Sequence, residues 1–479
     1  MRKNHKRRSR WAARQPICFF FCVYIEEEKM KHVFKDRAFL KTMFMLAIPI
    51  TLQSFITSSL NLVDTMMVGS LQETAISAVG LANKYMFIFT LCIMGVNAGA
   101  NVFMSQLWGK RDLKGIKTFM GVDLTVGLMV AGLFGALAFF GPHIIMNVMS
   151  VDPAVIAIGE DYLRIVAVSC LFMSITQAYS TALRSTEQTK LPMYGSLLGV
   201  GINIVLNWIL IFGEFGIPAL GVQGAALATM LARLIEMIFV VGMVYMTKNK
   251  VAAKLKEMFN YKWSTMVLYF KTSWSVILNE LIFSVGSAAY SVAYAKISTN
   301  ASATMQISGT IIDMFFIFLT GVGTAAAIMI GNKIGAKEEE RAKEYASHVG
   351  KLTPLIGISL GIGLWFLAPI VPTWFKIQPE TYQDTVTVLR TMAIFMPFRA
   401  FNAIMIIGVF RGGADTTYSM IVQAATILCY SVPMAFIGAV ALKWPVYLVF
   451  LLVCTEDFIK MPFEYWRLKS GKWMKNVVN

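Results

Sequence analysis

Long apolar stretches, separated by short polar segments, recur through almost the whole chain and constrain its fold more than any other feature. Each exceeds the roughly 20 residues that a helix needs to cross a bilayer. Because lipid offers backbone groups no water to bond, such crossing segments form helices. Twelve are found, at residues 42–67, 78–107, 119–141, 160–183, 191–213, 221–246, 264–290, 303–334, 347–370, 382–410, 416–440 and 444–466. The sequence therefore predicts an all-α polytopic membrane protein with 12 transmembrane helices.

Composition places the chain in the same class. It is 57% hydrophobic and 15% charged, whereas soluble domains are roughly 45 to 50% apolar and about 25% charged. The formal charge is +16, but the basic residues are scattered through the short gaps between stretches. No nucleic-acid partner is expected, since no single basic surface forms. The six cysteines have neither metal-ligand spacing nor a disulfide pattern, so no metal site is expected.

Lysine and arginine gather in alternate loops. With a cytoplasmic N-terminus, the six predicted outer loops contain only Lys296, Lys376 and Lys443, and the inner loops contain most of the rest. Basic residues are retained on the cytoplasmic side of a membrane. We therefore predict a multi-pass protein of the cytoplasmic (plasma) membrane, with both termini in the cytoplasm.

Residues 1–29 are unlike the rest of the chain. A basic segment is followed by an apolar run too short to span a bilayer, and then by Glu26–Lys29 directly before Met30. One interpretation is a basic arm on the membrane surface. We favour a start codon placed too far upstream, because a purine-rich ribosome-binding site would read as Glu-Glu-Glu-Lys if translated.

Several motifs recur at one offset along the chain. Gln106–Asp112, after the second stretch, is matched by Asn332–Glu338 after the eighth, and Arg184 is matched by Arg411. To within a single position, the same length of chain separates the members of every pair. Repeated matches at one offset indicate an internal duplication.

The duplication predicts the domain organisation. We expect an N-terminal six-helix lobe at 30–246, a cytoplasmic linker at 247–261 and a C-terminal six-helix lobe at 262–479. Because each lobe crosses the membrane an even number of times, a pseudo-twofold axis along the membrane normal relates them. Repeats of this kind enclose a substrate site near the bilayer midplane.

Asp64 is the first charged residue within a predicted span, and it lies downstream of Pro49. Proline removes a backbone hydrogen bond and bends a helix, so we predict a hinge at Pro49. A charge next to such a bend is suited to controlling it. The alternative is a carboxylate hydrated at the membrane interface, where charges cost little.

Two amides follow in the fifth stretch, at Asn203 and Asn207. Residues four apart share one face of a helix. Together they are able to bond a carboxylate and its ion, or to clamp two helices together. The spacing leaves both interpretations open.

Two further acids lie deep in spans, Glu280 in the seventh and Asp313 in the eighth. Ionisable residues within a membrane mark functional sites by default, although Lys271 is an alternative, purely structural partner for Glu280. Arg233 and Glu236 in the sixth span stand at the i, i+3 spacing of a self-compensating pair. We interpret that pair as structural.

Taken together, these motifs resemble those of the multidrug and toxic compound extrusion (MATE) family, from about residue 35 to residue 465. Each motif is short, but their order and spacing are specific. They are Pro49 with Asn61–Asp64, the segments Gly109–Asp112 and Gly335–Glu338, Asn203 with Asn207, Gly221–Thr229, and Phe410–Thr416.

The resemblance implies a V-shaped, two-lobed transporter that exports organic compounds, often cations, in exchange for H⁺ or Na⁺. It implies a coupling site at Asp64, Asn203, Asn207, Thr229 and Glu280. We expect no cofactor besides the coupling ion, and partners limited to a small organic substrate and membrane lipid, with the chain a monomer. The substrate cavity is expected at Gln53, Gln177, Asn279, Phe283 and Asp313.

The chain departs from the family at several of these positions. Trp274 and Ser275 stand where a proline often precedes the glutamate, and Phe283 replaces a common tryptophan. Asn207 stands where some members have a second aspartate, which leaves the coupling ion and its stoichiometry open.

Three alternatives differ in function. The nearest is a flippase for lipid-linked oligosaccharides or cell-wall precursors, which has the same architecture and for which a basic cavity would be evidence. An intramembrane enzyme is disfavoured because three of the four histidines lie in loops or the tail, the fourth stands at the very start of the ninth stretch, and no catalytic motif is present. Nothing resembles the selectivity filter of a channel.

Overall fold

The computed structural model describes residues 33–69, 71, 73–375 and 377–478. Residues 1–29, the doubtful N-terminal extension, lie outside this part. Within the described ranges the secondary structure is helical, without a strand. The predicted all-α class is confirmed.

The first part of the chain forms eight helices and a short linker helix. They are α4 (Arg37–Gly69), α5 (Glu73–Gly109), α6 (Leu113–Phe140), α7 (Pro142–Met149), α8 (Pro153–Ala167), α9 (Ser169–Ser185), α10 (Lys190–Phe212), α11 (Gly221–Met246) and α12 (Leu255–Phe259).

The second part contains the remaining elements, several of which join end to end. They are α13 (Trp263–Ala295), α14 (Thr299–Gly335), α15 (Glu339–Leu367), the 3₁₀ turn η1 (Val371–Trp374), α16 (Pro379–Ile404), η2 (Met405–Phe410), α17 (Thr416–Thr426), η3 (Ile427–Ser431), α18 (Val432–Phe436), η4 (Ile437–Ala441) and α19 (Val446–Ser470). The turns η2, η3 and η4 are π-helical.

Ten helices in the described ranges are long and apolar enough to cross a membrane. The two other predicted spans have identifiable interruptions. The fourth is divided between α8 and α9 at Val168, where the Ser169 hydroxyl donates to the Val166 carbonyl at 2.6 Å and competes with the helical pattern. The twelfth, α19, carries Glu456, Asp457 and Lys460 within its apolar length.

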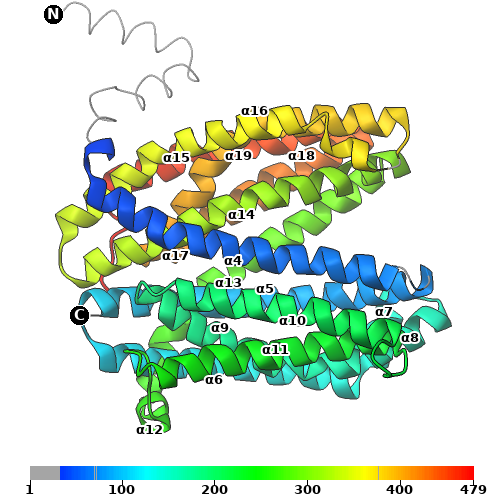
Figure 1. The fold of residues 1–479 in the computed structure, drawn as a ribbon. Coiled ribbons are helices and arrows are strands. Elements are labelled where there is room, and N and C mark those ends of the chain that lie inside the picture. Colours follow the sequence, from blue (N-terminus) through cyan, green and yellow to red (C-terminus); the bar gives the residue numbers. More distant parts are fainter. Residues whose placement is uncertain (1–32, 70, 72, 376, 479) are drawn as a thin grey trace, which may run out of the picture.

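Figure 1 shows two helical bundles with α4 between them. One contains α5 to α11, and the other contains α14 to α19. The linker helix α12 and the C-terminal residues lie at the same end of the molecule, here called the linker end. Since both lie at one end, the second bundle crosses an even number of times, as the duplication predicts.

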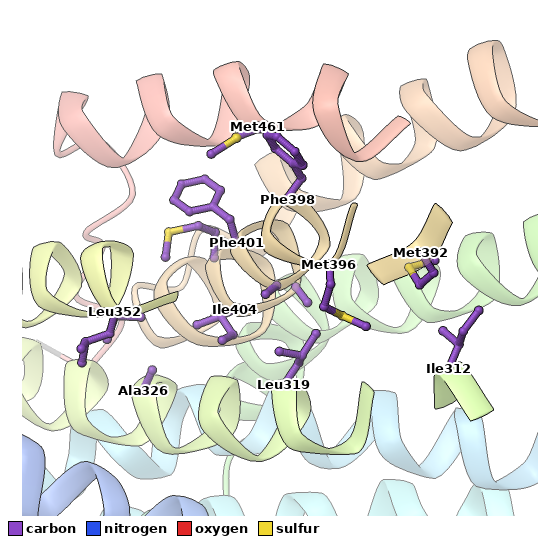
Figure 2. Close-up of a cluster of buried hydrophobic side chains, with 14 of the residues drawn as sticks. Ile312, Leu319, Ala326, Leu352, Met392, Met396, Phe398, Phe401, Ile404 and Met461 are labelled. Carbon is purple, nitrogen blue, oxygen red and sulfur yellow. The ribbon is translucent and has the colours of Figure 1, made fainter. Parts of the chain in front are cut away.

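The core of the second bundle surrounds α16. Figure 2 shows Met396, Phe401 and Ile404 of α16 meeting Leu319 of α14 and Met461 of α19. α16 also packs against α15. Methionine fills irregular gaps between helices because its side chain is flexible.

α4 belongs to both bundles. Before Pro49, its buried residues Phe39, Met43 and Leu46 join the core of the second bundle. After Pro49, Gln53 bonds Ser196 on α10 of the first bundle. Around the proline α4 contacts both bundles, because Ile50 still packs in the core of the second bundle and the Met45 carbonyl already bonds Thr189 of the first.

α13 mirrors this course in the second repeat. Near its start, Tyr269 packs in the core of the first bundle and donates to the Val96 carbonyl at 2.7 Å. Near its end, Ala293 and Tyr294 join the core of the second bundle. The first helix of each repeat therefore packs against both bundles.

The bundles meet closely at the linker end through two glycines. A Cβ on Gly109 would lie 1.9 Å from the Asn332 carbonyl oxygen, and one on Gly335 would lie 1.7 Å from the Gln106 carbonyl oxygen. These are the positions matched by the repeat, so the contact is reciprocal. Only glycine permits α5 and α14 to cross at this distance.

The C-terminal residues bind across this crossing. Gln106 of α5 donates to the Lys475 carbonyl at 3.0 Å and accepts from the Val477 amide at 3.0 Å. The Lys475 amide donates to the Gly413 carbonyl at 2.9 Å, and its ammonium lies 2.6 Å from Asp415. The segment therefore bonds both bundles at once.

Gly335→Ala is expected to lower the free energy of unfolding by about 1–3 kcal/mol, the usual cost of overpacking, because the new methyl collides with backbone. Gly242→Ala on α11 is the matched control, since a Cβ there has no atom within 4 Å. Thermal unfolding of the two variants in detergent measures the difference. Equal melting temperatures would show that the helices do not meet this closely.

Candidate functional site

Asp64 lies near the end of α4, facing α10. The Asn207 amide nitrogen donates both to an Asp64 carboxylate oxygen and, at 2.9 Å, to the Asn203 carbonyl oxygen. Asn203 in turn donates to the Thr229 hydroxyl of α11 at 3.4 Å. The four residues predicted for this part of the coupling site therefore form one chain of hydrogen bonds across three helices.

Position on the helices explains this convergence. Asn203 and Asn207 are four apart and fully buried, so they stack on one face of α10. The Asn207 carbonyl oxygen is buried without a hydrogen-bond partner among the described residues. The site therefore contains one unpaired acceptor, the Asn207 side-chain oxygen, beside a carboxylate. A bound cation or a protonated group is able to bond to it.

Tyr162 of α8 also belongs to this site, and sequence reasoning missed it. Its side chain is buried, interacts with Thr229 and Asp64, and donates to Asn83 of α5 at 3.4 Å. A single tyrosine in an apolar span gives no sequence signal, because aromatic residues are ordinary in that setting.

A second polar cluster lies nearer to Pro49. Gln53 donates to the Ser196 hydroxyl at 2.8 Å, and Ser196 donates to Glu236 at 2.8 Å. Arg233 bonds the other Glu236 oxygen at 2.8 Å, as the i, i+3 spacing predicted. Arg184 donates to the Gln53 carbonyl oxygen at 2.9 Å. Gln53 thus lies inside a closed network within the first bundle.

Arg233 connects the two clusters. It is ion-paired with Glu236 and also acts electrostatically on Asp64. Together the clusters contain two acids, Asp64 and Glu236, and two arginines, Arg184 and Arg233. The set is neutral when Asp64 is ionised and carries one positive charge when Asp64 is neutralised.

The helix bend at Pro49 has a specific partner. Proline has no N–H, so the carbonyl four residues earlier, that of Met45, lacks its helical donor. The buried Thr189 hydroxyl donates to this oxygen over 3.4 Å. In the second repeat, Thr416 donates to the Thr272 carbonyl at 3.2 Å. The tether is present in both repeats although Ser275 replaces the proline.

Glu280 forms a half-buried ion pair with Arg411. Lys271, the alternative partner considered from sequence, is exposed instead. Arg411 is the repeat counterpart of Arg184. In each repeat an equivalent arginine therefore bonds the first helix. The structure places Glu280 in the second bundle, separate from the hydrogen bonds around Asp64.

The residues predicted to line the substrate cavity do not form one described cluster. Asn279 is buried and its carbonyl oxygen lacks a hydrogen-bond partner in the described ranges. Gln177 is half-buried, and Phe283 and Asp313 are exposed. Their role in substrate binding stays a prediction.

A pocket of about 310 Å³ is found elsewhere, between the end of α9 and the loop after α11. Its lining comprises Trp108, Thr186, Gln188, Lys248, Asn249 and Lys250. None of these residues was predicted for the site.

A matching family model aligns with residues 49–209 and 275–437, more than half of the chain. The chain belongs to the MatE family. The two matched segments of this MatE protein begin at Pro49 and Ser275. These starting points have the same separation as Gln106 and Asn332. They therefore reproduce the offset of the internal repeat, and the two homologous halves are confirmed.

Known MatE relatives extend over nearly the whole chain. It is 21% identical over 455 residues to the probable multidrug resistance protein NorM of Thermotoga maritima, covering 95% of this chain and 96% of that protein.

Two crystal structures of MATE, in the straight and bent conformations, each have a TM-score of 0.82. The straight one is 19% identical and covers 90% of this chain and 96% of its own; for the bent one the values are 18%, 91% and 96%. They show that the fold is shared.

Thr189→Val is expected to destabilise the protein by about 1–3 kcal/mol, because it leaves the Met45 carbonyl, which has no helical donor, without a hydrogen-bond partner. Pro49→Ala restores a backbone N–H at the right position. In the Pro49→Ala background the same threonine substitution should therefore cost little. A double-mutant cycle on thermal unfolding measures the coupling, and additive effects would contradict the tether.

Proposed function

We propose that this chain is a secondary active efflux transporter of the plasma membrane that exports organic compounds, often cations, by antiport with H⁺ or Na⁺. One observation carries the proposal. Asp64, the acid of the first repeat's site, bonds α10 from the helix that lies between the two bundles and contains Pro49. The name of the Thermotoga maritima relative, a probable multidrug resistance protein, supports drugs as cargo.

Charge balance supplies the exchange. Two acids and two arginines form the connected clusters, so neutralising Asp64 leaves an excess positive charge near Arg233. An organic cation is then repelled, and an ion or proton leaving Asp64 restores the attraction. Coupling requires such a difference in affinity between states.

Movement of α4 supplies alternating access. Asp64 and Gln53 bond its second half to the first bundle, while Phe39 and Leu46 anchor its first half in the second bundle. Neutralising Asp64 weakens its bond to Asn207, because charged acceptors form stronger hydrogen bonds. The helix then pivots at Pro49, where Thr189 holds the exposed carbonyl.

The linker end is the cytoplasmic gate in this mechanism. Opening it separates Gly109 and Gly335 from the backbones that they contact and detaches the C-terminal residues from Gln106. Glu280 contributes a second acid that attracts cationic substrates once Arg411 releases it.

The second candidate is a flippase for lipid-linked precursors. Arg184 favours it, because this arginine donates to neutral Gln53 rather than to a carboxylate and so retains attraction for a phosphate. The acids Asp64 and Glu280 weigh against an anionic cargo.

Asp64→Asn should abolish energised efflux and leave the protein inserted, since asparagine keeps the size of the side chain and removes its charge. Glu214→Gln, at an exposed acid in the loop after α10, is the matched control and should transport normally. Efflux of a fluorescent organic cation from cells measures both. Normal transport by the Asp64 variant would exclude Asp64 as the coupling acid.

Collapsing the proton and sodium gradients separately in vesicles identifies the coupling ion. Efflux should stop when one of them is removed. Absence of cation efflux under both gradients would favour the flippase.

A further inference from the structure

A ladder of charged residues runs along one face of α19, inside an apolar helix. Glu456, Lys460 and Glu464 follow one another at four-residue steps and are 8%, 6% and 1% exposed. At 1.5 Å per residue the ladder extends over about 12 Å. Charges buried within a span are costly and mark functional sites.

The inner end of the ladder is fully bonded. Glu456 forms an ion pair with Lys460 and accepts from the Ser431 hydroxyl at 2.5 Å and the Tyr290 hydroxyl at 3.1 Å. The π-helical turn η3 ends at Ser431 and brings it to this position. Such turns often occur at functional sites.

Asp457 beside it is also bonded. Asn402 of α16 donates to its carboxylate at 3.1 Å, and the Arg399 guanidinium lies 3.8 Å away. Arg399 also interacts with Asp313 on α14, which places that predicted acid at the edge of this cluster.

Glu464 is different. Neither of its carboxylate oxygens has a hydrogen-bond partner among the described residues, although the side chain is 1% exposed. The titratable groups that interact with it are Lys460, Asp457 and Glu456 on its own helix and Tyr418 on α17. An ionised carboxylate in this position is strongly disfavoured.

The charges of the cluster do not balance. Three buried acids, Glu456, Asp457 and Glu464, face two bases, Lys460 and Arg399. Asp313, at the edge of the cluster, is exposed and is not counted. The two bases are each paired with one of the first two acids. One negative charge, on Glu464, remains for an external cation.

We propose that Glu464 is a second proton-binding site, in the lobe opposite to Asp64, and that its proton takes part in the exchange. A proton fits better than a metal cation because it neutralises the carboxylate without a coordination shell. Lys460 would repel a metal ion at the same place. This inference rests on the proposed antiport and names the proton as a coupling ion.

The internal repeat supports the assignment. At the offset of the repeat, Tyr290 is the counterpart of Asp64, while Glu456 and Lys460 are the counterparts of Thr229 and Arg233. In both bundles the first helix of the repeat therefore bonds into a polar site shared with the sixth. The acid is on the first helix in one lobe and on the sixth in the other.

Lys460 connects the proton to α13. When Glu464 is neutral, the ammonium pairs with Glu456, which accepts from Tyr290. When Glu464 is ionised, the ammonium is shared between two carboxylates and the bond to Tyr290 is altered. Since α13, like α4, packs against both bundles, a change in the bond between Tyr290 and Glu456 acts on it directly.

Glu464 lies close to one end of the span. It precedes the end of α19 at Ser470, near the linker end. The Tyr418 hydroxyl, which faces it, donates to the neighbouring Phe463 carbonyl at 3.0 Å. Release of the proton towards the cytoplasm is thus a short step.

Infrared titration of the purified full chain tests proton binding without transport. The protonated carboxyl of Glu464 should give a carbonyl band that disappears as the pH rises. The band should persist in Asp64→Asn and in Glu340→Gln, an exposed acid on α15, and be absent in Glu464→Gln. An unchanged band in Glu464→Gln would overturn the proposal.

Should Glu464→Gln fail to insert, Glu464→Asp gives the same information. Aspartate retains the acid, so the titrating band should remain at a shifted frequency. A band whose frequency is identical in this variant and in the wild type would belong to another residue and overturn the assignment.

Coupling is tested in liposomes with a fluorescent organic cation and the membrane potential clamped. A tenfold proton gradient supports about a hundredfold substrate gradient with two protons per substrate and about tenfold with one. Glu464→Gln should lower the limit by about tenfold, whereas an unchanged limit would overturn its coupling role. Failure of the proposed function is separate, because normal efflux by Asp64→Asn would reveal it.

Discussion

The structure of this protein depends on the pairing of charged side chains in a region where no water solvates them. Within a bilayer a charged side chain finds no solvent to bond, so it needs a partner within the protein. Arg233 pairs with Glu236, Arg411 with Glu280 and Lys460 with Glu456. Only the pair of Arg411 and Glu280 joins two helices, and the other two lie within α11 and α19. Among the described residues, Asp64, Asp123 and Glu464 are carboxylates without a basic side chain bonded to them. The two sites proposed for ions, at Asp64 and Glu464, are thus among the places where internal pairing is incomplete.

The two halves of the chain use one framework in different ways. Equivalent arginines bond the first helix of each repeat, and equivalent threonines bond its backbone. The polar residues within that framework have diverged. Pro49 corresponds to Ser275 and Asp64 to Tyr290. α4 therefore has a proline and an acid at the positions where α13 has a serine and a tyrosine. We therefore expect the two lobes to respond differently to the same ion.

Much of this organisation could be predicted from sequence because lipid imposes simple rules. Apolar length located the spans, one offset revealed the repeat, and the i, i+3 spacing identified the pair of Arg233 and Glu236. The group at Asp64, Asn203, Asn207 and Thr229 was predicted through resemblance to the MATE family, and its members do lie together. Contacts between distant segments could not be predicted in the same way. Glu280 and Arg411 are far apart along the chain. Nothing in the sequence around either residue indicates that the other is its partner. The charged residues of α19 were not singled out from the sequence, and the unpaired state of Glu464 depends on what the neighbouring helices supply.

The reciprocal glycine contacts have an evolutionary consequence. Each contact joins one residue from the first half to one from the second, so neither half is able to change there alone. A larger residue at position 335 demands a shift of the backbone at position 106, and the same holds for positions 109 and 332. Chimeras that exchange whole halves between relatives should assemble only where both halves keep these glycines. At this helix crossing the two halves of the duplicated gene are therefore constrained to change together.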